Sequence, residues 1–201
     1  MGERERLIQE ILEMELGMFL SVSAREPVSC QQDPEGFRMT RAAQFSVWSE
    51  QALSSYREDL ERAVEQGRNL MTLKYARMEN LIPKLHDDIL VENLIEQIVT
   101  MQVAWQKEMI TKYPYLMRRG RPLEEGEEGL QTTSFVRYLR GELETYSGET
   151  LAHLFRDMAE SQNNDRNLTE VIYEHMVRSH GYASIEEAEQ AARRQAEGGN
   201  D

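Results

Sequence analysis

The sequence predicts an all-α protein, a single compact multi-helix domain of about seven to nine helices with no sheet. Apolar residues recur at helical spacing along most of the chain, and no alternating strand pattern extends beyond a few residues. The 12 glycines and 5 prolines cluster in a few places and leave long stretches uninterrupted. With 201 residues, the chain can form one substantial core. We expect residues 1–190 to form this domain and residues 191–201 to be a frayed polar tail.

The first half of the chain contains five expected helices, each with an apolar stripe along one face. Asp33 caps a helix that Pro34 begins, and Ser49 caps the next one. Gly67 closes that helix in the left-handed conformation, and Pro83 limits the central helix that follows. These helices are expected at residues 4–21, 34–48, 49–67, 69–82 and 87–113.

The second half begins with residues 114–132, which we interpret as one irregular segment with an acidic, glycine-interrupted run. Thr133 or Ser134 is expected to begin the next helix, and Asn167 begins a later one that ends at Gly181. Ser184 opens a capping box for the last helix. These helices are expected at residues 134–146, 151–158, 167–181 and 184–190.

The central helix places two cations on its apolar face. A stripe that runs from Leu70 to Leu81 should face the core, yet Lys74 and Arg77 fall on the same side. An unpaired charge in a dry interior costs several kcal/mol, so both cations need partners. Polar residues also interrupt the apolar stripes of other helices. The complete set is Glu15, Arg41, Gln44, Lys74, Arg77, Gln102 and Glu142.

If these side chains converge, their charges can neutralise each other, because a guanidinium group forks onto a carboxylate. The cations outnumber the carboxylates, and such a surplus would favour a small anionic ligand such as a carboxylate or a phosphate. The alternative is that the long side chains lie along the edge of the core and their charged ends reach water. The predicted ligand-binding residues are Arg41, Lys74, Arg77, Arg119, Arg121, Tyr138 and Glu142.

Glu15, Cys30 and Tyr75 are the candidate catalytic residues, should the protein be an enzyme. Cys30 is the only cysteine and precedes a helix start, where the thiolate form is favoured. No histidine lies close to it in the sequence to serve as a base, and a half-buried residue in a turn is the alternative. Tyr75 could donate a proton to a ligand or be an ordinary core aromatic.

Composition and motifs argue against several function classes. The net charge of -13 disfavours binding to a nucleic-acid backbone or to an anionic membrane surface. No apolar run is long enough to span a bilayer, and the charged first residues do not fit a signal peptide. The sequence has no helical di-iron motif, zinc-ligand spacing, phosphate-binding loop, dinucleotide fingerprint or nucleophile elbow. We therefore expect no metal and no cofactor, and a single cysteine is consistent with the cytoplasm.

Several blocks of the sequence together match the pattern of a known family. They include Glu-Met-Glu-Leu-Gly-Met-Phe at 13–19, Ser-Cys-Gln-Gln-Asp at 29–33, Gln-Phe-Ser-Val-Trp at 44–48, Gly-Arg-Asn-Leu-Met-Thr-Leu-Lys-Tyr-Ala-Arg-Met-Glu at 67–79, Lys-Tyr-Pro at 112–114, Arg-Gly-Arg-Pro at 119–122, and the stretches 133–147 and 181–189. Together they resemble a bacterial family catalogued as a domain of unknown function, number 4125. The resemblance covers nearly the whole chain. It implies a cytosolic bacterial domain, stand-alone or fused, and it brings no established activity to this chain.

Two function hypotheses from different classes follow. The first is a small-molecule-binding protein or enzyme with a charged pocket between helices. The second is a protein-interaction or adaptor module whose acidic surface docks a partner. In a third, purely structural interpretation, the buried charges only fix the register of the helices.

Overall fold

The computed structural model describes residues 2–22, 33–124 and 133–198, and these ranges contain ten helices and no strand. The all-α prediction is therefore confirmed. The count exceeds the expected range because Pro114 begins a short helix inside the segment that we interpreted as irregular. The helices are α1 (Glu3–Leu20), α2 (Pro34–Phe45), α3 (Glu50–Glu65), α4 (Leu70–Met78), α5 (Ile89–Lys112), α6 (Pro114–Met117), α7 (Phe135–Leu143), α8 (Gly148–Asn163), α9 (Leu168–Ser179) and α10 (Ile185–Gly198).

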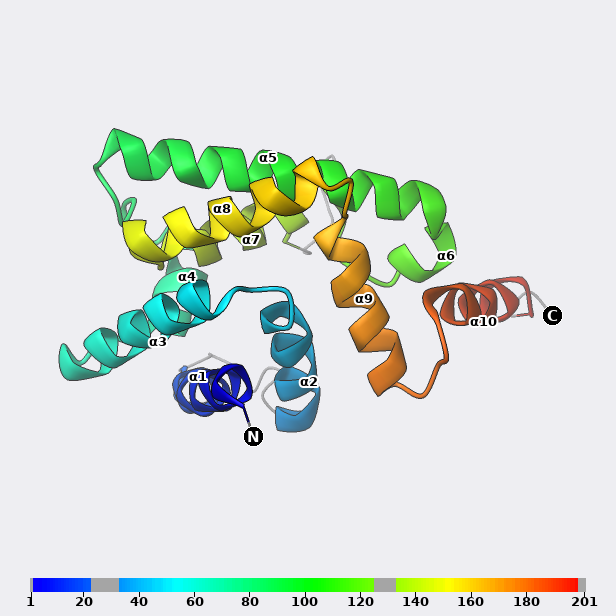
Figure 1. The fold of residues 1–201 in the computed structure, drawn as a ribbon, viewed down its shortest axis with the longest axis horizontal. Coiled ribbons are helices and arrows are strands. Elements are labelled where there is room, and N and C mark those ends of the chain that lie inside the picture. The colour runs from blue at the N-terminus through cyan, green and yellow to red at the C-terminus, as the bar shows by residue number, and fades with distance from the viewer. Residues whose placement is uncertain (1, 23–32, 125–132, 199–201) are drawn as a thin grey trace.

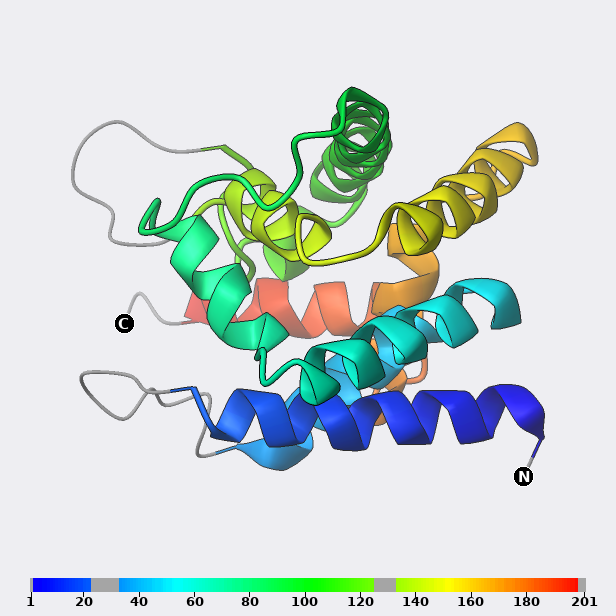
Figure 2. The same ribbon diagram turned by 90° about the vertical axis from the view of Figure 1, so that its left-hand side faces the viewer.

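Most of the helices lie in two layers. Helices α1, α2 and α3 form one layer, and α5, α7 and α8 form the other (Figure 1). Helix α4 connects the layers by contacting both α1 and α7, as Figure 2 shows from the side. Helix α9 makes a second connection by contacting both α2 and α5. Helices α6 and α10 pack together beyond α9, at one end of the molecule (Figure 1).

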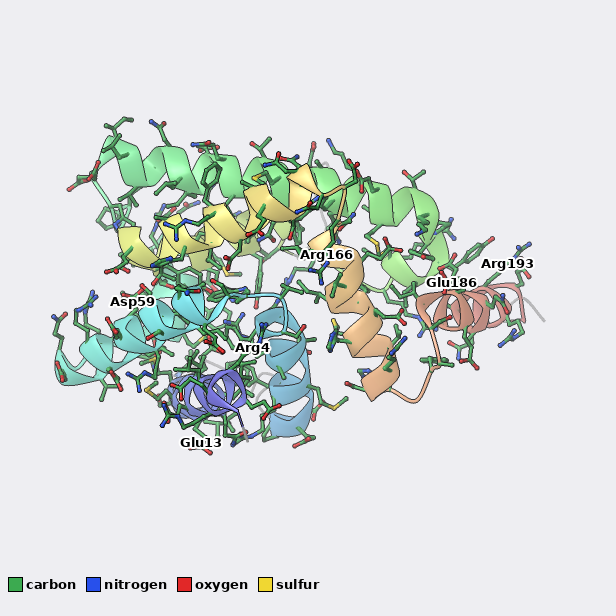
Figure 3. The ribbon with its side chains drawn as sticks, in the orientation of Figure 1. Arg4, Glu13, Asp59, Arg166, Glu186 and Arg193 are labelled. Carbon is green, nitrogen blue, oxygen red and sulfur yellow. The ribbon has the colours of Figure 1, made fainter. Side chains whose placement is uncertain are left out.

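Helices α3 and α8 cap each other across the two layers. Asp157 of α8 accepts a hydrogen bond from the backbone N–H of Ser49, the N-cap of α3, at 2.8 Å. Asp59 of α3, which Figure 3 labels, accepts one from the N–H of Ser147, the N-cap of α8, also at 2.8 Å. Each carboxylate satisfies an otherwise unpaired N–H and lies near the positive end of a helix dipole. The exchange holds the two helices antiparallel and in register.

The buried apolar residues form two separate groups. The larger one, which we name the central core, fills the space between the layers. Its fully buried members include Ile11, Phe45, Leu53, Tyr56, Leu60, Ile98, Tyr146 and Leu151. The smaller one, the C-terminal cluster, consists of Met109, Tyr113, Met117, Val177, Ile185 and Ala188.

Some details of the sequence prediction were wrong. Leu81, expected in the core, is 70% exposed because α4 ends at Met78, before the apolar stripe is complete. Helix α10 continues to Gly198, beyond residue 190 where fraying was expected, because Ala188 and Ala192 are buried along one of its faces. None of the described helices has the combination of length and apolar character that a bilayer crossing requires.

Candidate functional site

Arg41 occupies the centre of a buried polar network. It is 4% exposed, and its guanidinium group forks onto Glu15 of α1, with Nε 2.7 Å from Oε2 and Nη2 2.5 Å from Oε1. Its remaining nitrogen, Nη1, donates to Oε1 of Glu142 at 2.6 Å and to Oε1 of Gln44 at 2.5 Å. Every nitrogen of the guanidinium group therefore has an oxygen partner, as burial of an arginine requires.

Lys74 and two tyrosines complete the network. Nζ of Lys74 donates to Oε2 of Glu142 at 2.5 Å, and the lysine is only 2% exposed. The hydroxyl group of Tyr56 donates to Oε1 of Glu15 at 2.6 Å, and that of Tyr146 donates to Oε1 of Glu142 at 2.7 Å. Both oxygens of each carboxylate thus accept at least one hydrogen bond. The Arg41 network, named for its centre, consists of Glu15, Arg41, Gln44, Tyr56, Lys74, Glu142 and Tyr146.

The network keeps its charges in spite of burial. Burial acts against the charged form of Glu142, but Arg41 and Lys74 hold the pKa of its carboxyl group far below the usual range. Burial likewise disfavours the cations, yet the neighbouring carboxylates raise the pKa of Arg41 and of Lys74. Burial raises the pKa of the Tyr146 hydroxyl, and Glu142 raises it further, so this group stays a hydrogen-bond donor.

The expected surplus of positive charge is absent from the described interior. Arg77, the third predicted cation, forms a forked pair with Glu144, at 2.5 Å from Nε to Oε2 and 3.0 Å from Nη2 to Oε1. Its Nη1 donates to the carbonyl group of Ile82, outside the Arg41 network. Two cations and two carboxylates remain in the network, which is therefore neutral. The network therefore has no excess positive charge that would favour an anionic ligand.

A cavity of about 120 Å³ lies beside the network, between α2, α5, α7, α8 and α9. Five aromatic side chains contribute to its wall: Trp48, Trp105, Phe135, Tyr138 and Tyr146. Its polar lining consists of Gln44, Gln102, Glu142, Asp157 and Thr169 together with the two tyrosines, and leucine, valine, isoleucine and methionine side chains complete it. The wall thus combines apolar surface with a few polar groups, the usual make-up of a small-molecule site.

The family follows from the sequence over almost its full length. The model of the family described as "Protein of unknown function (DUF4125)" matches residues 5–190. The chain belongs to this family. No curated protein and no solved structure matches the chain significantly.

The structure brings together part of the predicted site in this DUF4125 member. Glu15, Arg41, Lys74 and Glu142 meet in the network, while Gln44, Gln102, Tyr138 and Glu142 line the cavity. Their roles in binding stay predictions. Sequence reasoning missed Tyr56 and Asp157 as polar contributors. Asp157 follows the buried Leu154 and precedes the buried Met158, and this position in an apolar stripe was the available signal.

The other predicted residues lie outside the network. Arg121 is exposed and stacks over the ring of Tyr138, with its guanidinium carbon 4.5 Å from the ring centroid. Arg119 is also exposed and donates to the side chain of Gln195 near the end of α10. Tyr75 is half-buried against the central core. Cys30 lies outside the described residues, and its predicted role stays a prediction.

Glu15, a candidate catalytic residue, is fully engaged inside the Arg41 network. Glu15 has no exposed surface, its oxygens already accept three hydrogen bonds, and it does not line the cavity. A general base must come within hydrogen-bonding reach of its substrate, and the catalytic role of Glu15 stays a prediction. Within the described ranges, no three His, Cys, Asp or Glu side chains are placed to hold a metal ion.

Proposed function

We propose that this protein binds a small molecule in the cavity between α2, α5, α7, α8 and α9. The observation that carries the proposal is the cavity itself, since protein interiors are otherwise close-packed and large voids in them are few. An empty cavity lowers stability, because the atoms around it lose contacts. A ligand that fills the space restores those contacts.

The Arg41 network supports this function by fixing two polar groups of the cavity wall. Glu142 is held by Arg41, Lys74 and Tyr146, and the side-chain oxygen of Gln44 is held by Arg41. Groups that are fixed before binding lose little freedom when the ligand arrives. In this proposal Gln44, Gln102, Tyr138 and Glu142 contact the ligand, while the buried cations hold the wall in place. We place the protein in the cytoplasm, with which its single cysteine is consistent, and in a bacterium, as the family resemblance implies.

The test is ligand screening with two independent signals. Trp48 and Trp105 line the cavity, so binding should change tryptophan fluorescence, and it should also raise the melting temperature. We expect at least one member of a panel of small metabolites of each charge class to produce both changes. No response from any class would count against a small-molecule site.

Two matched variants assign a response to the cavity. Val47→Phe adds bulk to the cavity wall, whereas Val64→Phe adds the same bulk at a position that is 59% exposed. We expect Val47→Phe to abolish the response and Val64→Phe to retain it. Binding that survives Val47→Phe unchanged would place the ligand elsewhere.

A second candidate function is the docking of a protein partner. Three large apolar side chains around the α4–α5 connection, Leu81, Ile89 and Leu90, are each about two-thirds exposed or more. Exposed apolar side chains of this kind occur at protein interfaces. If the intact chain binds a protein partner in a pull-down experiment, Leu90→Asp should abolish this binding. A partner that binds the Leu90→Asp variant equally well would argue against this function.

A further inference from the structure

Asp157 brings to the cavity a carboxylate that no cationic side chain of the described residues pairs with, although it caps the N-terminus of α3. One of its oxygens, Oδ2, accepts the backbone N–H of Ser49. Across the described residues, no Lys, Arg or His forms a salt bridge with it, and Oδ1 has no hydrogen-bond donor. The charges of the Arg41 network cancel. The wall of the cavity therefore carries a net negative charge, located at Asp157.

The aromatic residues of the cavity wall also favour a positively charged ligand. The ring of Trp48 lies 5.9 Å from that of Tyr146 in an edge-to-face arrangement, and both side chains line the cavity with Trp105. The faces of such rings carry partial negative charge and attract cations, most strongly where water is excluded. The protein already uses this attraction nearby, because Nζ of Lys74 lies 3.7 Å from the ring centroid of Tyr138.

The size of the cavity limits the ligand. A cavity of about 150 Å³ accommodates benzene, so one of about 120 Å³ accommodates a slightly smaller group. Most of the lining is apolar and suits methyl groups better than a hydrated ammonium group. Building on the proposed function, we infer that the cavity takes a small organic cation with a methylated ammonium group, whose positive charge lies near Asp157 and the rings of Trp48, Trp105 and Tyr146.

The surrounding positive charges do not oppose this assignment. Arg41 and Lys74 are each paired with a carboxylate, and neither lines the cavity. Arg121 stacks on Tyr138 but is exposed, so water and salt screen its charge. The whole chain carries a net charge of -13, which raises the local concentration of cations at its surface.

The test compares two probes that differ in charge and have nearly the same shape. Tetramethylammonium and tert-butanol have the same number of non-hydrogen atoms around a tetrahedral centre, but only the first is charged. We expect tryptophan fluorescence titration of the full chain to show that tetramethylammonium binds at least about tenfold more tightly than tert-butanol. Pivalate, an anion of similar shape, should bind more weakly than either.

The reciprocal caps of α3 and α8 supply a matched pair of variants. Asp157→Asn removes the charge at the cavity and keeps an oxygen for the N–H of Ser49. Asp59→Asn makes the same change at the cap of α8, which does not line the cavity. We expect Asp157→Asn to weaken tetramethylammonium binding about tenfold and Asp59→Asn to leave it unchanged.

The outcomes separate this inference from the proposed function. The assignment of a cation would be overturned if tert-butanol bound as tightly as tetramethylammonium, or if pivalate bound more tightly. Equal effects of Asp157→Asn and Asp59→Asn would also overturn it. In each case, binding of a small molecule in the cavity would still stand. If no probe binds and the metabolite panel also gives no response, both are overturned. Preferential binding of tetramethylammonium that is lost only with Asp157→Asn supports both.

Discussion

The molecule contains the same polar chemistry twice, once in its interior and once near its surface. In the central core, Tyr56 and Arg41 both donate to Glu15, which has no exposed surface. At the C-terminal cluster, the hydroxyl group of Tyr113 donates to Glu170 at 3.0 Å, and Lys112 donates to the same carboxylate at 2.5 Å. The first site joins residues of three helices, whereas the second joins two consecutive residues at the end of α5 to Glu170 of α9.

The difference between the sites is access to water. The side chains of Lys112 and Glu170 are 56% and 36% exposed, so water can replace either partner if one is removed. In the central core, a lost partner leaves a charge buried with nothing to solvate it. The apolar surroundings differ in the same way: the central core is large, whereas the C-terminal cluster has six buried members. We infer that polar contacts hold the central core in one arrangement and contribute little to the C-terminal end.

The largest effect should follow from removing Glu15. Glu15→Ala leaves the guanidinium group of Arg41 without its forked partner, and loss of one member of a buried pair costs about 3–5 kcal/mol. Glu170→Ala, the matched change at the C-terminal cluster, should cost less than about 1 kcal/mol, because its ionic partner Lys112 is exposed and Tyr113 keeps Glu186 as an acceptor. Urea unfolding at neutral pH measures both.

If Glu15→Ala does not fold, Glu15→Gln provides the same comparison, since the amide keeps one acceptor but removes the charge. It should still destabilise the protein more than Glu170→Gln does. Similar losses at the two positions would contradict the idea that solvent access separates the two sites.

Acid should weaken the central core through Glu142. The folded-state pKa of its carboxyl group lies below the unfolded value, so its stabilising effect is present above about pH 4 and is lost as the pH falls toward the folded-state pKa. Arg41 and Lys74 have raised pKa values, so their contributions persist below their unfolded values and stay constant throughout the acid range. A loss on the order of 3 kcal/mol is expected between about pH 5 and the acid limit.

This expectation is checked by measuring the unfolding free energy of the native chain and of Glu142→Gln from neutral pH into the acid range. The variant should be less stable at neutral pH and should lose less stability on acidification. Glu186→Gln, at the exposed end of the C-terminal cluster, should change the acid dependence much less. An acid dependence that Glu142→Gln leaves unaltered would show that another carboxylate controls it.

The sequence could predict which residues face inward but not which of them meet. Helical periodicity placed Glu15, Arg41, Lys74 and Glu142 on apolar stripes, since 3.6 residues per turn fix the face of each position. The partner of Arg77 was missed, because its pairing with Glu144 depends on how α4 crosses α7. Crossing geometry arises from contacts between distant segments, which a stripe on one helix does not contain.

The fold prediction was incomplete where the structure depends on more than local helical patterns. All-helical architecture follows from local patterns, and the structure confirmed it. The early end of α4, which exposes Leu81, depends on the left-handed backbone at Asn80, where φ is 55°. The cavity could not be predicted from sequence, because its volume is the space left over after five helices have packed.

The next effect in size concerns the close contact of α4 with α7 in the central core. A Cβ atom added at Gly141 would lie 2.7 Å from Cγ of Met78 and 3.2 Å from the carbonyl oxygen of Lys74. Gly141→Ala should therefore separate the helices and cost about 1–3 kcal/mol. Gly120→Ala, beside the C-terminal cluster, meets its nearest atom at 3.4 Å and should be nearly neutral. Thermal unfolding of the two variants checks the difference, and a loss at Gly120 equal to that at Gly141 would contradict it.

The smallest effect is expected at a surface pair of the C-terminal end. Arg178 on α9 is bonded to Glu174 one turn earlier, at 2.7 Å from Nη2 to Oε1, and its side chain is 64% exposed. Exposed pairs of this spacing contribute about 0–1 kcal/mol and are screened by salt. Arg178→Ala should therefore lower the unfolding free energy slightly at low ionic strength and not measurably in about 1 M salt. Glu15→Ala, in contrast, should keep most of its effect in the same salt, because its charges are buried. A loss in Arg178→Ala that persisted at high salt would show that the C-terminal end depends on its ion pairs as the central core does.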